Sequence, residues 1–416
     1  MINLIINGGR KEVMEYEQEV IDFIIDYPKP VHLLKMSGDG RFIVTIHEGD
    51  KWINVWDVEY QTLFCQFKNE TSDFEDIYYR EWDNIYDDSM IFSRDSKYLI
   101  VGFDVGMVKV FNIEHKVEQY CYDFFKVERK DINMWGVYDI PHTYLETSED
   151  GNYFAISCSC AIDPQSGDGD ISTWEIYPEP IRTVFVIDLR TGDIILNHTF
   201  PEGRIASIAF SFDEQYFAAA ISSGELVLWD LYNKKTIYRD EKFSWCNFTD
   251  TIIRKRIAFD TSSRQMFYTA FKSIKVLDIL TLESREFGST EDPLPDVLLS
   301  ISSEFGVLLG ASQFYENLFI WDISSEEMVC VGPPLQYEPR KIQISEEIVV
   351  VIYASLIEIY DLSTLEQISI IEGKIPENCF GYFPKDVSRD CSKIAAFKKD
   401  QENTESGIKI IINKIK

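Results

Sequence analysis

The sequence has little positive charge and very few histidines. Forty Lys and Arg residues stand against seventy Asp and Glu residues in a chain of 416, and only five His are present. The formal net charge is −30. A field of this sign repels nucleic-acid phosphates and anionic lipids. We therefore expect no direct binding of nucleic acid, and either a basic protein or peptide as the partner or a charge that serves only solubility.

Long hydrophobic runs are missing as well. No apolar run approaches the roughly 20 residues that a membrane helix needs, and the apolar run in MINLIINGGRKEVMEY is too short for a signal peptide. The eight Cys are scattered, mostly within strand-like segments, which is typical of reduced thiols. These features predict a cytoplasmic protein, with the nucleus as the alternative, and no membrane association.

The common catalytic motifs are also absent: no P-loop, GxGxxG, GxSxG or HExxH occurs. The turn DPQSGDGD (163–170) gathers carboxylates that could bind calcium but lacks the EF-hand spacing, so a solvated acidic turn is the simpler interpretation. Cys158 and Cys160 could form a metal or redox pair, but no second Cys/His pair lies nearby. We expect no enzyme activity, no cofactor and no metal site.

One pattern recurs along the chain. FSRDSKYLIVGF (92–103) places a polar S-x-D-x turn between two apolar runs and is followed by the β-rich segment VKVFN. Eight such units occur, and their third apolar segments end at residues 56, 111, 187, 229, 277, 321, 360 and about 411. Each unit predicts an antiparallel meander of four strands. Meanders of this kind bury both faces by stacking around an axis.

The ends of these third segments resemble the WD-repeat β-propeller family over nearly the whole chain. The resemblance rests on Trp56-Asp57, Trp229-Asp230 and Trp321-Asp322, with looser forms at Phe111-Asn112, Ile187-Asp188, Leu277-Asp278 and Tyr360-Asp361. It implies buried tryptophans at these positions and a non-catalytic interaction scaffold. The family's Gly-His dipeptide is missing throughout, so its buried Asp-His-Ser-Trp network cannot form as usual, and the chain is identified as a divergent member.

The fold class expected is all-β: an eight-bladed β-propeller of four-stranded antiparallel blades, forming a single domain over residues 1–416. The last unit lacks a fourth strand, and EVIDFIID (19–26) is a spare strand before the first unit. We expect the two to pair and close the ring, which removes exposed sheet edges. Seven blades is the alternative, if a terminal unit packs outside the ring.

Three long insertions, at 68–88, 125–142 and 160–182, are expected on one face of adjacent blades. Carboxylates and aromatic side chains are mixed in them, a composition that suits Lys/Arg-rich peptides. The residues predicted to bind a partner are Asp76, Tyr78, Tyr79, Glu81, Trp82, Asp83, Trp135 and Trp174. The alternative is that these aromatic side chains pack together as a local core.

The function expected is a non-catalytic protein–protein interaction scaffold that binds a basic partner on this loop-rich face. We expect one copy of the chain, not a homo-oligomer, within a larger complex. Two alternatives remain open. One is a structural subunit that uses the propeller rim. The other is a propeller oxidoreductase. It is less favoured, because no haem motif CxxCH is present.

Overall fold

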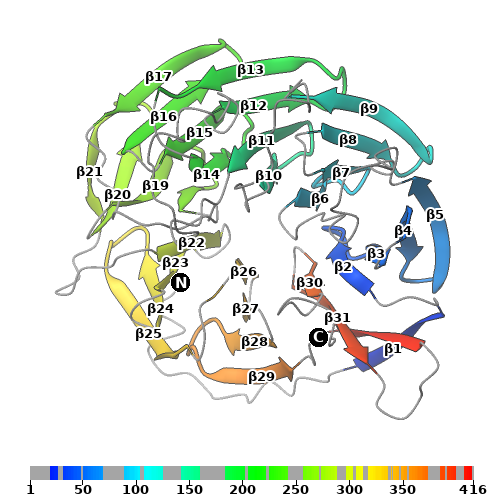
Figure 1. The fold of residues 1–416 in the computed structure, drawn as a ribbon. Helices are drawn as coiled ribbons and strands as arrows, with labels where there is room; N and C mark the ends of the chain where they lie inside the picture. The colour runs from blue at the N-terminus through cyan, green and yellow to red at the C-terminus, as the bar shows by residue number, and fades with distance from the viewer. Residues whose placement is uncertain are drawn as a thin grey trace, which may run out of the picture. The chain divides into compact units, whose positions relative to one another are not determined.

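The computed structural model of the protein (Figure 1) is described here for a defined set of residues. These are residues 19–26, 31–47, 50–68, 89–103, 107–124, 142–159, 183–201, 205–221, 224–241, 256–270, 273–287, 297–302, 306–312, 317–335, 339, 341–345, 348–353, 356–372, 385–388, 391–399 and 407–414. They fall into two compact units, one of Met1–Asn69 with Lys255–Lys416 and one of Glu70–Arg254.

The first unit contains five antiparallel sheets of four strands. Their strands, in sheet order, are β2 (Val31–Met36), β3 (Phe42–His47), β4 (Trp52–Asp57) and β5 (Thr62–Lys68); β18 (Ile257–Phe259), β19 (Gln265–Ala270), β20 (Ser273–Asp278) and β21 (Ser284–Phe287); β22 (Val297–Ser302), β23 (Val307–Ser312), β24 (Asn317–Asp322) and β25 (Met328–Pro334); β26 (Lys341–Ile344), β27 (Ile348–Ile352), β28 (Leu356–Asp361) and β29 (Gln367–Glu372); and β30 (Lys385–Val387), β31 (Lys393–Lys399), β32 (Gly407–Lys414) and β1 (Glu19–Asp26).

The second unit contains three sheets of the same kind. Their strands are β6 (Met90–Phe92), β7 (Tyr98–Gly102), β8 (Met107–Asn112) and β9 (Val117–Asp123); β10 (His142–Thr147), β11 (Tyr153–Ser159), β12 (Thr183–Asp188) and β13 (Ile194–Thr199); and β14 (Ile205–Phe210), β15 (Tyr216–Ile221), β16 (Glu225–Asp230) and β17 (Lys235–Asp240). No helix with the length and apolarity of a membrane span occurs in the described part of the chain.

The predicted eight-bladed ring is wrong, because the fold has seven blades. Only seven of the sheets are blades built from four consecutive strands, from β2–β5 through β26–β29. The remaining sheet is composite, with β30, β31 and β32 from one end of the chain and β1 from the other. Counting third-segment ends therefore overstates the number of complete blades by one, because the last unit has only three strands of its own. The alternative of seven blades gives the number of complete blades.

The pairing predicted for residues 19–26, by contrast, is confirmed. β1 runs antiparallel to β32 along its full length, from Glu19 opposite Lys414 to Asp26 opposite Gly407. The composite sheet packs beside the first blade, where β2 lies against β30 and β31. Its buried Val387, Ile394 and Ala395 share a core with residues of β2–β4 and β27–β29. The two ends of the chain are thus joined within one sheet.

The turn between the first and second strands of a sheet, here called the first turn, follows from the S-x-D-x pattern. In the first blade the Ser37 backbone N–H donates to the Phe42 carbonyl at 2.9 Å. The Ser37 hydroxyl donates to Asp39 at 2.6 Å and accepts the Phe42 N–H at 2.8 Å. The fourth turn residue, Gly40, has a φ of 63°. Equivalent residues with positive φ are Ser96, Gly151, Glu214, Ser263 and Cys391. Side-chain capping and one left-handed residue therefore close these hairpins.

The core lies between neighbouring sheets, because the second and third strands are buried on both faces. All six residues of β3 and all six of β16 are buried. Trp56, Trp229 and Trp321 near the ends of third strands are 9%, 3% and 1% exposed. The prediction that these three tryptophans are buried is confirmed.

Replacing Trp229 or Trp321 by Ala should lower the free energy of unfolding by about 3–5 kcal/mol, through lost apolar burial and the cavity left behind. Urea unfolding followed by circular dichroism measures this. Trp52, the 41% exposed first residue of β4, is the matched control, and Trp52→Ala should cost less than about 1 kcal/mol. Equal losses in all three variants would contradict the assignment of Trp229 and Trp321 to the core.

Candidate functional site

The residues that the sequence predicts to bind a partner lie at 76–83, 135 and 174, outside the described residues. Their role stays a prediction. What the structure does describe is where two of the insertions leave the sheet β10–β13. His142 at the start of β10 is opposite Ser159 at the end of β11, and Ser157 is opposite Val184 near the start of β12. The chain therefore leaves for residues 125–141 and 160–182 from the same end of this sheet.

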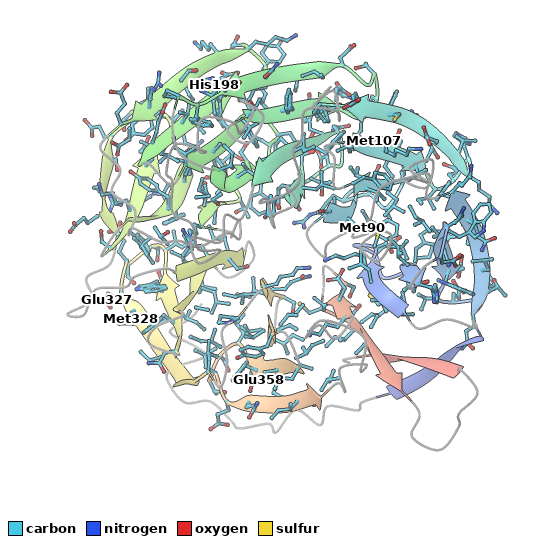
Figure 2. The ribbon with its side chains drawn as sticks, viewed as in Figure 1. Met90, Met107, His198, Glu327, Met328 and Glu358 are labelled. Carbon is cyan, nitrogen blue, oxygen red and sulfur yellow. The ribbon has the colours of Figure 1, made fainter. Side chains whose placement is uncertain are left out.

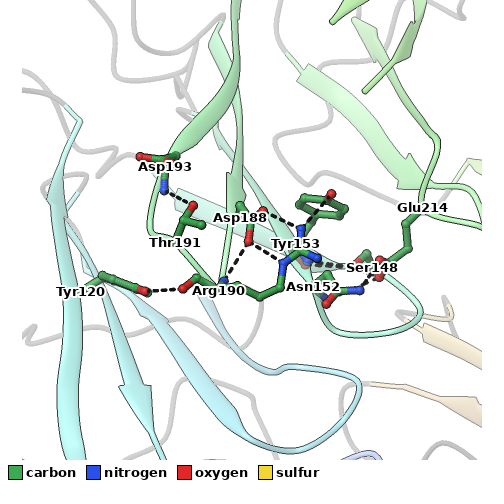
Figure 3. A network of polar contacts seen from close by, with 9 residues as sticks. All are labelled: Tyr120, Ser148, Asn152, Tyr153, Asp188, Arg190, Thr191, Asp193 and Glu214. Carbon is green, nitrogen blue, oxygen red and sulfur yellow. Dashed lines mark hydrogen bonds and ion pairs between the residues drawn. The ribbon is translucent and has the colours of Figure 1, made fainter. Parts of the chain in front are cut away.

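The opposite end of the same sheet carries a network of polar contacts (Figure 3). It includes the first turn, around Ser148 to Asn152, and the turn between the third and fourth strands, here called the third turn, at Asp188 to Asp193. Because antiparallel strands alternate in direction, these two turns share one end of the sheet. The network is thus the best-defined polar site among the described residues, and it is built entirely within the second unit.

The third turns are all held by the side chain that ends the third strand. Asp57 accepts the backbone N–H groups of Glu59 and Tyr60 at 3.0 and 3.1 Å. The same contact to the turn is made by Asn112, Asp188, Asp230, Asp278, Asp322 and Asp361. The residue four positions later always has a positive φ; these residues are Gln61, Lys116, Gly192, Lys234, Leu282, Glu326 and Leu365. The Asp or Asn that ends each WD-like dipeptide is therefore a turn cap.

Arg190 extends the cap of the third turn in Figure 3. Its guanidinium donates to both carboxylate oxygens of Asp188, at 3.0 and 2.6 Å, and to the Tyr153 hydroxyl at 3.2 Å. It also lies over the Tyr153 ring, 5.4 Å from the centroid. The hydrogen bond from Arg190 holds the pKa of Asp188 below its usual range. The carboxylate is thus ionised throughout the neutral range and serves the turn, not proton transfer.

Two tyrosines of the preceding blade donate hydrogen bonds to this turn. The Tyr120 hydroxyl donates to the Arg190 carbonyl at 3.2 Å and the Tyr122 hydroxyl donates to the Gly192 carbonyl at 2.9 Å. Gly192 has a φ of 78°, and a Cβ built there would lie 2.6 Å from the Tyr120 ring. Glycine is required here by contact as well as by conformation, because the other third turns accept larger residues in the left-handed region.

A second set of hydrogen bonds joins the first turn of this sheet to the next sheet. Glu214, in the first turn of β14–β15, accepts the Ser148 hydroxyl at 2.5 Å and the Asn152 side-chain amide at 2.6 Å. It also accepts the Asp150 backbone N–H at 2.9 Å. On the other side of the same turn Arg94 donates to Glu149 at 2.6 Å. Three successive sheets of the second unit are therefore tied together through charged residues of their first turns.

The network offers no obvious chemistry on a substrate. A serine beside a carboxylate is a possible nucleophile and base. However, Ser148 is fully buried, and its oxygen also accepts the Tyr153 N–H at 2.9 Å. No cluster of three or more His, Cys, Asp or Glu side chains that could hold a metal ion occurs among the described residues. The geometry is that of a rigid inter-blade joint.

Two other polar groups, His198 and Glu358, are labelled in Figure 2. His198 lies edge-on to Phe200 and Trp229, with ring centroids 4.8 and 5.1 Å apart, and burial lowers its pKa. Glu358 is buried and accepts hydrogen bonds from the hydroxyls of Tyr353 and Tyr360 at 2.5 and 2.6 Å. Glu358 is thus satisfied inside the sheet, whereas His198 is half-buried on β13 and its buried Nε2 has no hydrogen-bond partner among the described residues.

In the first blade Trp56 takes part in a chain of polar contacts. The indole N–H of Trp56 donates to the Thr45 hydroxyl at 2.8 Å, and that oxygen lies 3.0 Å from Nε2 of His47. Trp321 shows the alternative, because its buried indole N–H has no hydrogen-bond partner among the described residues. The first blade thus contains a Thr-His-Trp chain of polar contacts, while at Trp321 apolar packing dominates.

Comparisons with known proteins show the fold alone. No family model and no curated protein matches the sequence. The structure is similar to the crystal structure of the computationally designed Ika8 protein, with a TM-score of 0.61 and 15% sequence identity over 96% of this chain and 100% of that one. The fold is a β-propeller with seven complete four-stranded antiparallel blades. The comparisons assign the chain to no family.

Gly192 provides a test of the joint between blades. Gly192→Ala should lower the free energy of unfolding by about 2–4 kcal/mol, because the new methyl group meets Tyr120 in addition to the left-handed strain. Gly306 is the matched control: its φ is 62°, and a Cβ there would meet nothing within 4 Å. Gly306→Ala should cost only about 1 kcal/mol. Equal urea midpoints for the two variants would show that Tyr120 does not hold the turn.

The turn caps predict a specific dependence of stability on pH. The hydrogen bond from Ser324 lowers the pKa of Asp322, so the charged cap is stabilising above the unfolded pKa of about 4 and is lost as the pH falls through the lower folded value. Asp322→Asn retains an acceptor, as Asn112 does in its own blade. The stability difference between wild type and Asp322→Asn should therefore shrink from pH 5 to pH 2. A difference independent of pH would contradict the ionised cap.

Proposed function

We propose that this chain is a divergent WD-repeat propeller that acts as a non-catalytic scaffold and binds a basic protein or peptide on its acidic, aromatic insertions. The observation that carries the proposal is the composition of residues 68–88. Eight carboxylates lie there together with five aromatic side chains: Phe74, Tyr78, Tyr79, Trp82 and Tyr86. A net charge of −30 steers cationic segments toward the protein.

The two ends of the sheets differ in how their charged side chains are used. At the end that carries the first and third turns, charged side chains form caps and inter-blade contacts, as Asp188 and Glu214 do. The described third turns are capped by the residue that ends each third strand, so the repeat does not account for the carboxylates of the insertions. Insertions whose length differs from blade to blade, and which are not part of the repeated turns, are typical of binding loops. The scaffold would act in the cytoplasm or the nucleus, as a monomer within a larger complex.

A second candidate function, a structural subunit that uses the rim, is favoured by one observation. Several fourth strands expose large apolar side chains; these are Leu63, Val117, Ile194, Met328, Val331 and Ile370. Single exposed apolar residues are common on protein surfaces, however. We therefore place this candidate second. An oxidoreductase would hold a coloured cofactor, and an absorbance spectrum of the purified protein tests that class directly.

The proposed function is tested with a fluorescein-labelled peptide rich in Lys and Arg. Changing Asp76, Glu81 and Asp83 to their amides should slow association and flatten its salt dependence. The matched control changes Glu59, Glu114 and Glu283, three exposed carboxylates of third turns, to Gln. It removes the same charge elsewhere. Equal slowing by both triple variants would mean that the peptide responds only to the overall field.

The aromatic residues are tested separately. Trp82→Ala or Trp135→Ala should speed dissociation of the same peptide and cost about 1–3 kcal/mol of binding free energy, because buried aromatic anchors dominate interfaces. The melting temperature should stay unchanged. If these variants instead unfold while peptide binding persists, the aromatic side chains form a local core and the scaffold must bind elsewhere.

A further inference from the structure

The composite sheet joins strands from the two ends of the chain. Its order is β1, β32, β31 and β30, so β1 lies at one edge. In Figure 1 the blue strand β1 lies beside the red strands of the C-terminal end. Among the described strands, β32 is the main contact of β1, and all eight residues of β1 are paired with it. One antiparallel ladder therefore holds most of the contact between β1 and the rest of its sheet.

This ladder pairs an acidic strand with a basic one. The sequence of β1 is EVIDFIID, with three carboxylates and no base, and that of β32 is GIKIIINK, with two lysines and no acid. In the register Glu19 is opposite Lys414. Asp22 and Asp26 are opposite the residues two positions to either side of Lys409. Facing and diagonal pairs of opposite charge stabilise antiparallel strands. The edge of β32 is therefore suited to an acidic strand with the pattern of β1.

The connection between β1 and the first blade is short. β1 ends at Asp26 and β2, which belongs to a different sheet, begins at Val31. The linker between them is Tyr-Pro-Lys-Pro, residues 27–30. Proline fixes φ at about −65°. Short hinge segments favour exchange of a terminal element between two copies of a protein, because exchange relieves the constraint on the hinge and keeps the contacts of the element.

We propose that β1 is an exchangeable strand, so that the β32 edge of one copy binds β1 of a second copy of this chain and a symmetric dimer forms. All eight strand pairs of the closed copy recur in the exchanged dimer. The two forms therefore differ mainly in the constraint on the hinge and in the entropy of association. The net charge of −30 opposes the approach of two copies, so the closed monomer predominates at low concentration. The exchange does not rest on the proposed scaffold function, which belongs to the closed monomer.

Cysteine variants of the full-length chain test the exchange. Val20 is opposite Asn413, and facing residues of a ladder are close enough for a disulfide. Copies with Val20→Cys and copies with Asn413→Cys, carrying tags of different size, are co-expressed and oxidised. We expect at least tenfold more disulfide-linked mixed-tag dimer than with Val20→Cys and Ile408→Cys. Ile408 is opposite Ile25 and is the register control. Co-expressed wild-type copies give the background from the eight native cysteines.

Closure within one copy is measured with Val20→Cys and Asn413→Cys in the same chain. This double variant should form the disulfide in the monomer, because the closed form has the same register. If it does so while the co-expressed single variants yield no more mixed-tag dimer than the register control, β1 stays in its own copy and the proposal fails.

The linker provides an independent measurement by light scattering after size-exclusion chromatography. The dimer fraction should rise with protein concentration. Inserting six Gly and Ser residues after Tyr27 should lower that fraction at least fivefold, because a longer hinge lets β1 close within its own copy without constraint. The melting temperature should stay at the wild-type value, since the ladder is unchanged. A dimer that persists equally after the insertion would show that the copies associate through another surface, which would overturn the exchange.

Discussion

The structure depends on a carboxylate or amide that ends the third strand of each blade and caps the turn to the fourth. The capped turn forces the residue four positions later into the left-handed region in all seven complete blades. In six of them the strand pairing also shifts by one residue just before the turn, as between Val55 and Trp56 or Leu228 and Trp229. A bulge at this point increases strand twist. Cap, left-handed residue and bulge together therefore set how the fourth strand lies along each blade.

This constraint explains why the repeat tolerates so much variation elsewhere. Trp, Phe, Ile, Leu and Tyr all precede the capping residue in different blades, because that position needs only apolar bulk. The cap itself varies only between Asp and Asn, since it must accept backbone N–H groups two or three residues later. The pKa values of Asp188, Asp278 and Asp322 are lowered by hydrogen bonds from their own turns, which shows that the charge stabilises the turn locally.

The repeat itself could be predicted from the sequence, because both ends of each hairpin have local signatures. Ser37, Ser93 and Ser211 cap first turns within five residues, and the Asp caps act within three. The number of complete blades could not be read from third-strand ends, because a strand end does not show where the fourth strand comes from. The joints between blades could not be predicted either, because their partners are far apart in the sequence. Glu214 looks like an ordinary turn residue until Ser148 and Asn152, more than 60 residues away, are brought to it.

The joints have a consequence for where binding residues can lie. At the turn end of the second unit, polar side chains contact a neighbouring blade, as Tyr122 does where its hydroxyl donates to the Gly192 carbonyl. The composite sheet is held in a comparable way, because Asp386 and Gln343 link it to β2 and β26. Surplus charge that no joint uses is therefore more informative about ligands than charge as such. By this criterion the carboxylates of 68–88 stand out in the sequence, because the described third turns are capped by other residues.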